Sequence, residues 1–218
     1  SFISITGKRG IKMDIFEKQH NGMLYVPTDE TIVREQAKYL EFLYDYNHTR
    51  PSQQEERTAM LQEMLAEIGE NSYIEPPFRA NWGGHFLHFG KNVYANFNLT
   101  IVDDTHIYVG DNTMFGPNVM ITTAGHPILP ELRGEEAYQF NMPVTIGQNC
   151  WIGANVSIMP GVTIGDHTVI GAGSVVTQDI PADVVAMGVP CRVIRQINEH
   201  DKEYYYKDRK IDWDSIDR

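Results

Sequence analysis

Apolar side chains recur at steps of three and four residues in two segments near the beginning of the chain. Residues 29–46 show this spacing, which gathers apolar side chains on one stripe of a helix. A second helix is predicted from Ser52, which has capping-box spacing with Glu55, to Gly69. Pro76 and the proline after it end the helical part, because proline disfavours helix at the residue before it. Both stripes indicate packing faces.

A six-residue period follows the helical part. Aliphatic residues recur at this step without interruption at Ile146, Ile152, Ile158, Ile164, Ile170 and Val176. The same period runs upstream through Phe89, Ala95 and Ile101, slips by two residues near Asp103 and Asp104, and resumes at Val109, Phe115 and Ile121. Such a period is typical of a hexapeptide β-helix, in which three short strands make one coil and inward residues stack about 18 residues later. An ordinary β-sandwich would leave the period unexplained.

These patterns divide the chain into four parts. We expect a leader or upstream extension in residues 1–12 and a helical N-terminal subdomain in residues 13–75. The β-helix is predicted over residues 76–190, with an inserted loop at 122–142, and a C-terminal segment covers residues 191–218. That last segment is polar and aromatic, so we expect it to dock on the prism or on a neighbouring subunit.

Charge and cysteine content narrow the possible partners and compartment. The chain has 18 basic and 29 acidic residues and a formal net charge of -11. This excess of negative charge argues against a general nucleic-acid or anionic-membrane surface, so an anionic ligand needs a local basic patch. Cys150 and Cys191 are too few for a disulfide framework. No apolar run reaches the ~20 residues that span a bilayer. A cytoplasmic protein is predicted.

His126 is the clearest candidate for chemistry. It lies in the segment Ala124-Gly125-His126-Pro127, where the regular coil gives way to the long loop. An imidazole at such an edge can act as a general base on a hydroxyl group, although a surface or packing role is the simpler interpretation. A second interpretation is a zinc site that uses histidines from the set His85, His88, His106 and His126. Hexapeptide-repeat carbonic anhydrases carry two histidine ligands with four residues between them; this chain has no such pair, and no metal is predicted.

Several segments carry a more specific resemblance. They are Tyr94-Ala95-Asn96-Phe97-Asn98, Ile101-Val102-Asp103-Asp104, Gly125-His126-Pro127, Trp151-Ile152-Gly153, Pro160-Gly161-Val162-Thr163-Ile164-Gly165-Asp166, Gly171-Ala172-Gly173-Ser174 and Gly188-Val189-Pro190-Cys191-Arg192-Val193-Ile194. With these segments and the helical beginning, residues 20–200 resemble the hexapeptide-repeat sugar O-acetyltransferases. The galactoside O-acetyltransferases are most similar, followed by the maltose O-acetyltransferases.

The resemblance implies a mainly β fold, a left-handed parallel β-helix that forms homotrimers with active sites between adjacent subunits. It implies transfer of an acetyl group from acetyl-CoA to a sugar hydroxyl. By position, His126 matches the general base and Asn96 matches a residue beside the reacting carbon of the acetyl donor. Asp104 matches a sugar-binding carboxylate, and Ala154 matches a position whose backbone N–H faces the acetyl group.

The resemblance also implies a binding path for the acetyl donor. Ala172, Thr177 and Gln178 match positions along the pantetheine and nucleotide, with Trp151 flanking the same groove. Arg192 and Arg195 match residues at the nucleotide phosphates. They would supply the local basic patch that this acidic chain requires.

The sequence departs from the family pattern at three places. A sugar-contacting aspartate near the beginning of the family's chains matches Asp29 only with a shifted alignment. Gln178 stands where a basic residue is usual. Spacing over residues 79–85 differs by one residue, so no role is assigned there. Two alternatives stay open. One is an acyltransferase of the same fold acting on an antibiotic or a serine hydroxyl, and the other is a non-catalytic trimeric scaffold.

Overall fold

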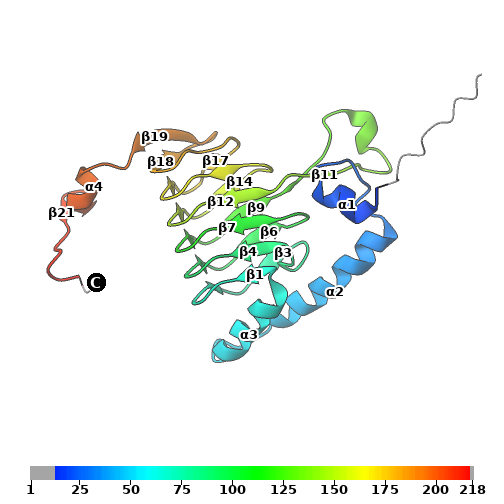
Figure 1. Ribbon diagram of the computed structural model, residues 1–218, viewed down its shortest axis with the longest axis horizontal. Coiled ribbons are helices and arrows are strands. Elements are labelled where there is room, and N and C mark those ends of the chain that lie inside the picture. Colours follow the sequence, from blue (N-terminus) through cyan, green and yellow to red (C-terminus); the bar gives the residue numbers. More distant parts are fainter. Residues whose placement is uncertain (1–12, 217–218) are drawn as a thin grey trace, which may run out of the picture.

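Three helices precede the β-helix in the computed structural model, which describes residues 13–216 (Figure 1). They are α1 (Ile15–His20), α2 (Glu30–Asn47) and α3 (Gln54–Met64). Helix α2 confirms the helix predicted over 29–46, and the Asp29 side chain caps it by accepting a hydrogen bond from Thr31 N at 2.8 Å. The residues predicted to form a leader, 1–12, lie outside the described residues.

The other helix predictions need correction. Helix α1 was not predicted, because only Asp14 and Glu17 signal its start as a capping box. Helix α3 begins at Gln54 and not at Ser52, and no side-chain capping bond is present, so the predicted capping box is wrong. A turn occupies that position, in which Gln53 N donates to Arg50 O at 2.9 Å. The helix also ends at Met64, five residues before Gly69, because the chain becomes extended and enters the first coil of the prism.

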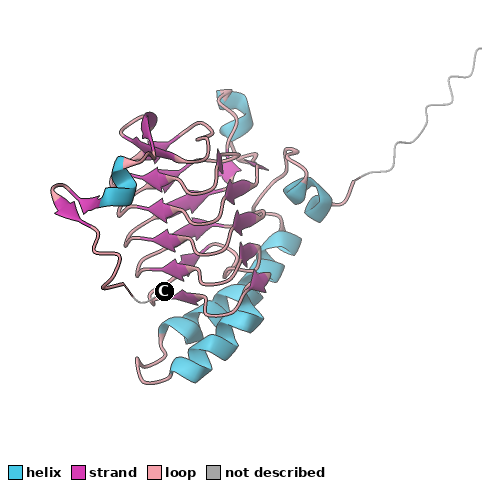
Figure 2. Cartoon of the chain, turned by 60° about the vertical axis from the view of Figure 1, so that its left-hand side comes forward, coloured by secondary structure: helices cyan, strands magenta, loops and turns pink. Residues whose placement is uncertain are grey.

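The prism is a parallel β-helix with three faces (Figures 1 and 2). The first face contains β1 (Glu67–Ile68), β4 (Leu87–Phe89), β7 (Ile107–Val109), β12 (Val144–Ile146) and β15 (Thr163–Ile164). The second contains β2 (Tyr73–Ile74), β5 (Tyr94–Ala95), β8 (Met114–Phe115), β13 (Trp151–Ile152), β16 (Val169–Ile170) and β18 (Val184–Met187). The third contains β3 (Arg79–Ala80), β6 (Thr100–Val102), β9 (Met120–Thr122), β14 (Ser157–Ile158) and β17 (Val175–Val176).

The predicted hexad residues fill the interior of this prism. All twelve are buried, with exposed fractions between 0% and 4%. Ile152 is paired with Ile170, the predicted 18 residues away, whereas Phe89 is paired with Val109, 20 residues away, because of the two-residue slip. Burial of one such aliphatic side chain stabilises the fold by about 1.5–3 kcal/mol. The six-residue period therefore predicted both the fold and its core.

The corners of the prism bring successive coils very close together. A Cβ added to Gly165 would lie 2.3 Å from the backbone nitrogen of Ala182, so no larger residue fits there without backbone movement. Asparagines in the left-handed backbone region turn other corners, and Asn92 donates from Nδ2 to Oδ1 of Asn112 one coil away at 3.0 Å. These contacts keep each face flat and in register.

Two segments depart from the regular coils. In the inserted loop, β10 (Ala124–Gly125) pairs antiparallel with β11 (Phe140–Asn141), with a 3-10 turn (η1, Pro130–Arg133) at its tip. At the other departure, β19 (Arg192–Gln196) pairs antiparallel with β18 and ends the parallel stack. The chain then forms α4 (His200–Glu203) and a hairpin of β20 (Tyr204–Tyr206) and β21 (Arg209–Lys210). Figure 1 shows this tail leading away from the prism, so docking on a neighbouring subunit remains a prediction.

Candidate active site

One corner of the prism, between the second and third faces, carries three of the predicted site residues. Asn96, Ala154 and Ala172 each lie just after a strand of the second face, β5, β13 and β16. The turns stack directly, since Gly173 N donates to Ala154 O at 2.8 Å. We call this edge the donor corner. Residues up to 76 positions apart in the sequence thus form one column.

The donor corner presents hydrogen-bond donors. Asn96 is half-buried, and its Oδ1 accepts a hydrogen bond from Phe97 N at 2.8 Å, which leaves both Nδ2 protons for another partner. The N–H of Ala154 makes no hydrogen bond within residues 13–216. Asn96 and Ala154 follow β5 and β13, with β8 between these strands, and an amide donor at such an edge can stabilise an oxyanion.

The corner between the third and first faces carries the predicted base. We call it the base corner. His126 follows β10 and is exposed, and its Nδ1 lies 2.8 Å from the carbonyl oxygen of Tyr138. A carbonyl can only accept a hydrogen bond, so Nδ1 carries the proton and the neutral ring keeps a lone pair at Nε2. The loop therefore holds the imidazole in the tautomer that a general base requires.

Asp104 lies on the base corner just after β6 and is only 4% exposed. Its Oδ1 accepts from Asn81 Nδ2 and its Oδ2 accepts from Gln139 Nε2, each at 2.7 Å. Burial raises the pKa of Asp104, while these hydrogen bonds and the nearby charge of His126 act in the opposite direction. The Tyr25 side chain also hydrogen-bonds this carboxylate, so its two oxygens take part in three hydrogen bonds and keep acceptor capacity for a further donor.

Asn81 and Gln139 were not predicted as site residues. Asn81 lies in the segment 79–85, to which no role was assigned, and Gln139 lies in the inserted loop. Neither belongs to a periodic pattern or a motif. Their proximity to Asp104 arises from contacts across 23 and 35 sequence positions, which only the folded chain reveals.

The base corner and the donor corner are separated by the whole third face. With its turns, one side of a coil takes about six residues, which at roughly 3.3 Å per extended residue puts the two corners on the order of 15 Å apart. This is too far for one reacting carbonyl to contact His126 and Asn96 of the same chain.

The residues predicted to line the donor path are distributed over both corners and the tail. Trp151 projects from the second face with an exposed fraction of 55%, and Thr177 and Gln178 are exposed after β17. Arg192 and Arg195 lie on the exposed strand β19. The guanidinium of Arg195 donates to the Asp201 carboxylate at 2.7 and 2.8 Å and to Gln196 O at 3.0 Å, and Arg192 donates to Cys191 O at 2.9 Å. Phosphate binding by these arginines stays a prediction.

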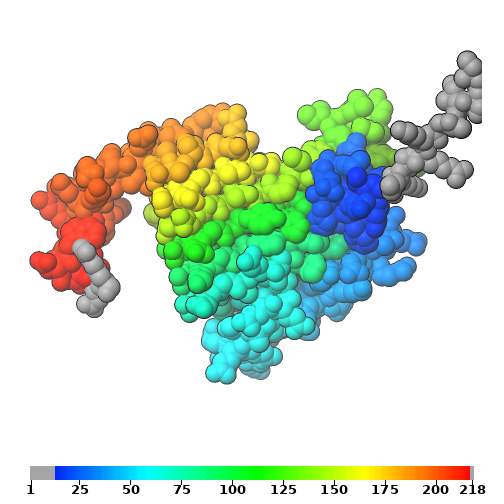
Figure 3. All heavy atoms as spheres, viewed as in Figure 1, coloured from blue at the N-terminus to red at the C-terminus, as the bar shows by residue number. Residues whose placement is uncertain are grey.

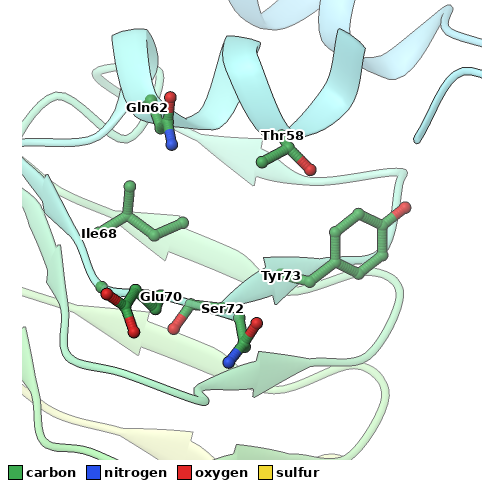
Figure 4. A pocket seen from close by; sticks show the side chains of 8 residues that line it. Thr58, Gln62, Ile68, Glu70, Ser72 and Tyr73 are labelled. Atoms are coloured by element: carbon green, nitrogen blue, oxygen red, sulfur yellow. The ribbon is translucent and has the colours of Figure 1, made fainter. Parts of the chain in front are cut away.

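Two cavities bear on where a ligand could bind. One of about 320 Å³ is lined by Tyr25, Asp29 and Tyr138, which puts Asp29 beside the residue that holds His126. The other, of about 350 Å³, lies between α3 and the first coil and is lined by Thr58, Gln62, Ile68, Glu70, Ser72 and Tyr73, with Gly69 and Asn71 (Figure 4). That second cavity contains none of the predicted site residues.

Residues 13–216 contain neither a group of metal ligands nor a membrane-spanning helix. No three His, Cys, Asp or Glu side chains in this range are grouped as a metal site. His88 and His106 contact each other, with 2.9 Å between His88 Nε2 and His106 Nδ1, while His126 stands on the loop. None of the helices in the same range has the length and apolar character needed to cross a bilayer.

Comparisons with known proteins agree with this architecture. The chain matches the bacterial transferase hexapeptide (six repeats) family over residues 143–178 and the maltose acetyltransferase hexapeptide capping motif over residues 18–69. It is 50% identical over 205 residues to galactoside O-acetyltransferase of Lactococcus lactis subsp. lactis (strain IL1403), covering 94% of this chain and 99% of the relative. For the Escherichia coli (strain K12) galactoside O-acetyltransferase the identity is 48% over 202 residues, covering 93% and 98%.

A solved structure supports the same relationship. A galactoside acetyltransferase in complex with coenzyme A superposes with a TM-score of 0.88 at 48% sequence identity, covering 91% of this chain and 98% of the other. Identity at this level over nearly the whole length leaves no large segment of the fold unmatched. The chain therefore belongs to the galactoside O-acetyltransferase family of hexapeptide-repeat transferases.

Proposed function

We propose that this protein transfers the acetyl group of acetyl-CoA to a hydroxyl of a galactoside-type sugar, in a ternary complex with His126 as the general base. The observation that carries the proposal is the 2.8 Å bond between His126 Nδ1 and Tyr138 O, which leaves Nε2 free to take a proton beside the carboxylate of Asp104. The names of the relatives reported above, and a relative's complex with coenzyme A, support the reaction class.

The reaction needs no covalent intermediate with the protein. His126 Nε2 takes the proton of the sugar hydroxyl as its oxygen attacks the thioester carbonyl, while Asp104 accepts hydrogen bonds from neighbouring sugar hydroxyls. Asn96 Nδ2 and the N–H of Ala154 stabilise the oxyanion, and one such donor contributes on the order of 10²–10³ in turnover. The carbon–sulfur bond then breaks, and His126 returns its proton to the CoA sulfur.

The active unit in this proposal is a cytoplasmic homotrimer with sites between adjacent chains. Its support is the separation of His126 from Asn96 and Ala154 across the third face, which a second chain would bridge. Acetyl-CoA would lie along the neighbouring chain's donor corner. Its proposed contacts are Trp151, Ala154 and Ala172 on that side, Thr177 and Gln178 after β17, and Arg192 and Arg195 on β19.

An acceptor panel tests this proposal. With acetyl-CoA as donor, galactosides, maltose, glucose, serine and a hydroxyl-bearing antibiotic are compared for the wild type, His126→Ala and the control His48→Ala. His48 is a matched control because it is exposed and its Nδ1 also contacts a backbone carbonyl, that of Tyr44, at 2.7 Å. We expect His126→Ala to lose at least about 100-fold in turnover with CoA binding retained, and His48→Ala to match the wild type.

The other outcomes decide among the alternatives. Unchanged turnover in His126→Ala contradicts the mechanism. Acetylation of serine or the antibiotic but of no sugar supports the acyltransferase with another acceptor. Failure of the wild type to bind acetyl-CoA at millimolar concentration supports the non-catalytic scaffold.

A further inference from the structure

We propose that Gln139 is a positioning residue that fixes the acceptor-binding carboxylate of Asp104 relative to the base His126. This inference rests on the proposed function and adds to it a residue that touches neither the acetyl group nor the reacting hydroxyl.

The Gln139 side chain is 6% exposed and its Nε2 has three neighbours that can accept a hydrogen bond. Asp104 Oδ2 lies at 2.7 Å, the Tyr25 hydroxyl at 2.8 Å and Asn141 Oδ1 at 3.0 Å. An amide has two N–H protons for these three acceptors. The ionised carboxylate is the strongest acceptor and the nearest, so one proton is directed to Asp104.

The backbone around Gln139 also holds the base. Tyr138, the preceding residue, supplies the carbonyl that accepts from His126 Nδ1. In the register of the β10–β11 pair, in which Gly125 faces Phe140, His126 falls opposite Gln139. Two consecutive residues therefore hold the two groups of the site. The carbonyl of Tyr138 holds the imidazole of His126, and the side-chain amide of Gln139 holds the carboxylate of Asp104.

This short segment is itself anchored to the beginning of the chain. Gln139 and Tyr25 exchange two backbone hydrogen bonds of 3.0 Å each. The buried Asn141 donates from Nδ2 to Gln19 O at 3.0 Å and to the Tyr25 hydroxyl at 2.9 Å. Figure 3 shows the first described residues (blue) lying beside the inserted loop (light green) at one side of the prism. The amide of Gln139 thus belongs to a rigid frame.

Loss of this amide would remove one of the donors to the buried carboxylate of Asp104, leaving Asn81 and the Tyr25 hydroxyl. Besides Asn81, the polar and titratable groups that act on this carboxylate are Tyr25, His126 and the neighbouring Asp103. With one donor fewer, burial raises the pKa of Asp104 further and the orientation of the carboxylate is less tightly fixed. Acceptor binding weakens as a result, while the acetyl-CoA contacts on the donor corner are unaffected.

The test uses steady-state kinetics of the full chain with a galactoside acceptor between pH 6 and pH 8. Gln139→Met keeps the volume and removes the donor, and Gln62→Met on the exposed surface of α3 is the matched control. We expect Gln139→Met to lower acceptor kcat/KM by about 10–100-fold, mostly through the acceptor KM, with the acetyl-CoA KM within twofold of the wild type.

A second variant, Gln139→Glu, adds a pH signature that a merely structural role would not produce. The introduced carboxyl lies against Asp104, and the two carboxyls share a proton more readily as the pH falls. A protonated carboxyl can donate to Asp104 as the amide does. The acceptor kcat/KM of Gln139→Glu relative to the wild type should therefore rise from pH 8 to pH 6.

The results separate the two proposals. If the wild type acetylates sugars, and Gln139→Met keeps the acceptor KM within twofold, the positioning role is wrong. A parallel rise in the acetyl-CoA KM, or a pH-independent ratio for Gln139→Glu, also contradicts it. If Gln139→Met fails to fold, the positioning role is decided by Gln139→Glu alone, from the pH dependence of its acceptor kcat/KM relative to the wild type. Failure of the wild type to acetylate any sugar overturns both proposals.

Discussion

Replacement of Gly116 by alanine tests whether the N–H of Ala154 takes part in acetyl transfer. Gly116 follows β8 at the donor corner, one coil before Ala154. A Cβ added there would lie 2.7 Å from Ala154 N and 3.0 Å from Ala154 Cα. Both are backbone atoms, so no flexible side chain can yield and the Ala154 peptide itself must move.

The distance by which the Ala154 peptide must move follows from its contact with the added Cβ. Ordinary van der Waals contact with a Cβ begins at 3.4 Å, so the Ala154 nitrogen must shift by about 0.7 Å or Gly116 must retreat by the same amount. An oxyanion donor contributes on the order of 10²–10³ in turnover, and a displacement near 1 Å can cost about 100-fold. We expect Gly116→Ala to lower kcat by about 10–100-fold. Overpacking should also destabilise the fold by about 1–3 kcal/mol.

The matched control is Gly110→Ala on the same coil. Its added Cβ would lie 2.5 Å from the backbone nitrogen of Gln148, so the crowding is equally severe, but the corner between the first and second faces carries none of the predicted site residues. Thermal unfolding and steady-state acetylation are measured for both variants. Both should lose thermal stability, and only Gly116→Ala should lose kcat beyond about twofold. Equal losses of kcat in the two variants, or normal kcat in Gly116→Ala, would refute the reasoning.

Two further predictions concern charged groups. Burial, with the nearby charges of His106 and His85, lowers the pKa of His20 to about 4 from its ordinary value of 6.5. The folded state therefore resists protonation, and stability should fall as the pH drops from 6.5 toward 4. In melting curves, His20→Asn should lose less melting temperature than the wild type between pH 7.5 and 4.5; an equal loss would contradict this cause. Arg195→Ala should raise the acetyl-CoA KM by about two- to fivefold, whereas Asp201→Asn, which releases the guanidinium, should not raise it. An unchanged KM in Arg195→Ala would remove that arginine from the phosphate site.

The sequence predicted the prism because the signal for it is local and repeated. Each hexad residue points inward on a strand of two or three residues, so one buried position in six is enough to set the coil. The apolar stripe over residues 29–46 predicted helix α2 for the same reason. The beginning of α3 was not, because the turn at Arg50 and Gln53 competes with the capping box that Ser52 and Glu55 suggested. Local capping signals of this kind can be overridden by a neighbouring turn.

Part of the candidate site was also readable from the sequence. His126 stands where the period breaks, and the resemblance to sugar O-acetyltransferases assigned roles to Asn96 and Asp104. The tautomer of His126 could not be predicted, because it depends on the carbonyl of Tyr138 across a loop of irregular conformation.

By itself, then, the sequence determined the coil, its inward residues and the edge on which the base stands, since these depend on spacing alone. Tertiary structure decided what surrounds Asp104. Asn81 reaches it from 23 positions away, Gln139 from 35, and Gln139 contacts Tyr25 across 114. Hydrogen bonds between such distant polar side chains depend on the direction and distance between them in the folded chain. They produce no periodic pattern in the sequence from which they could be predicted.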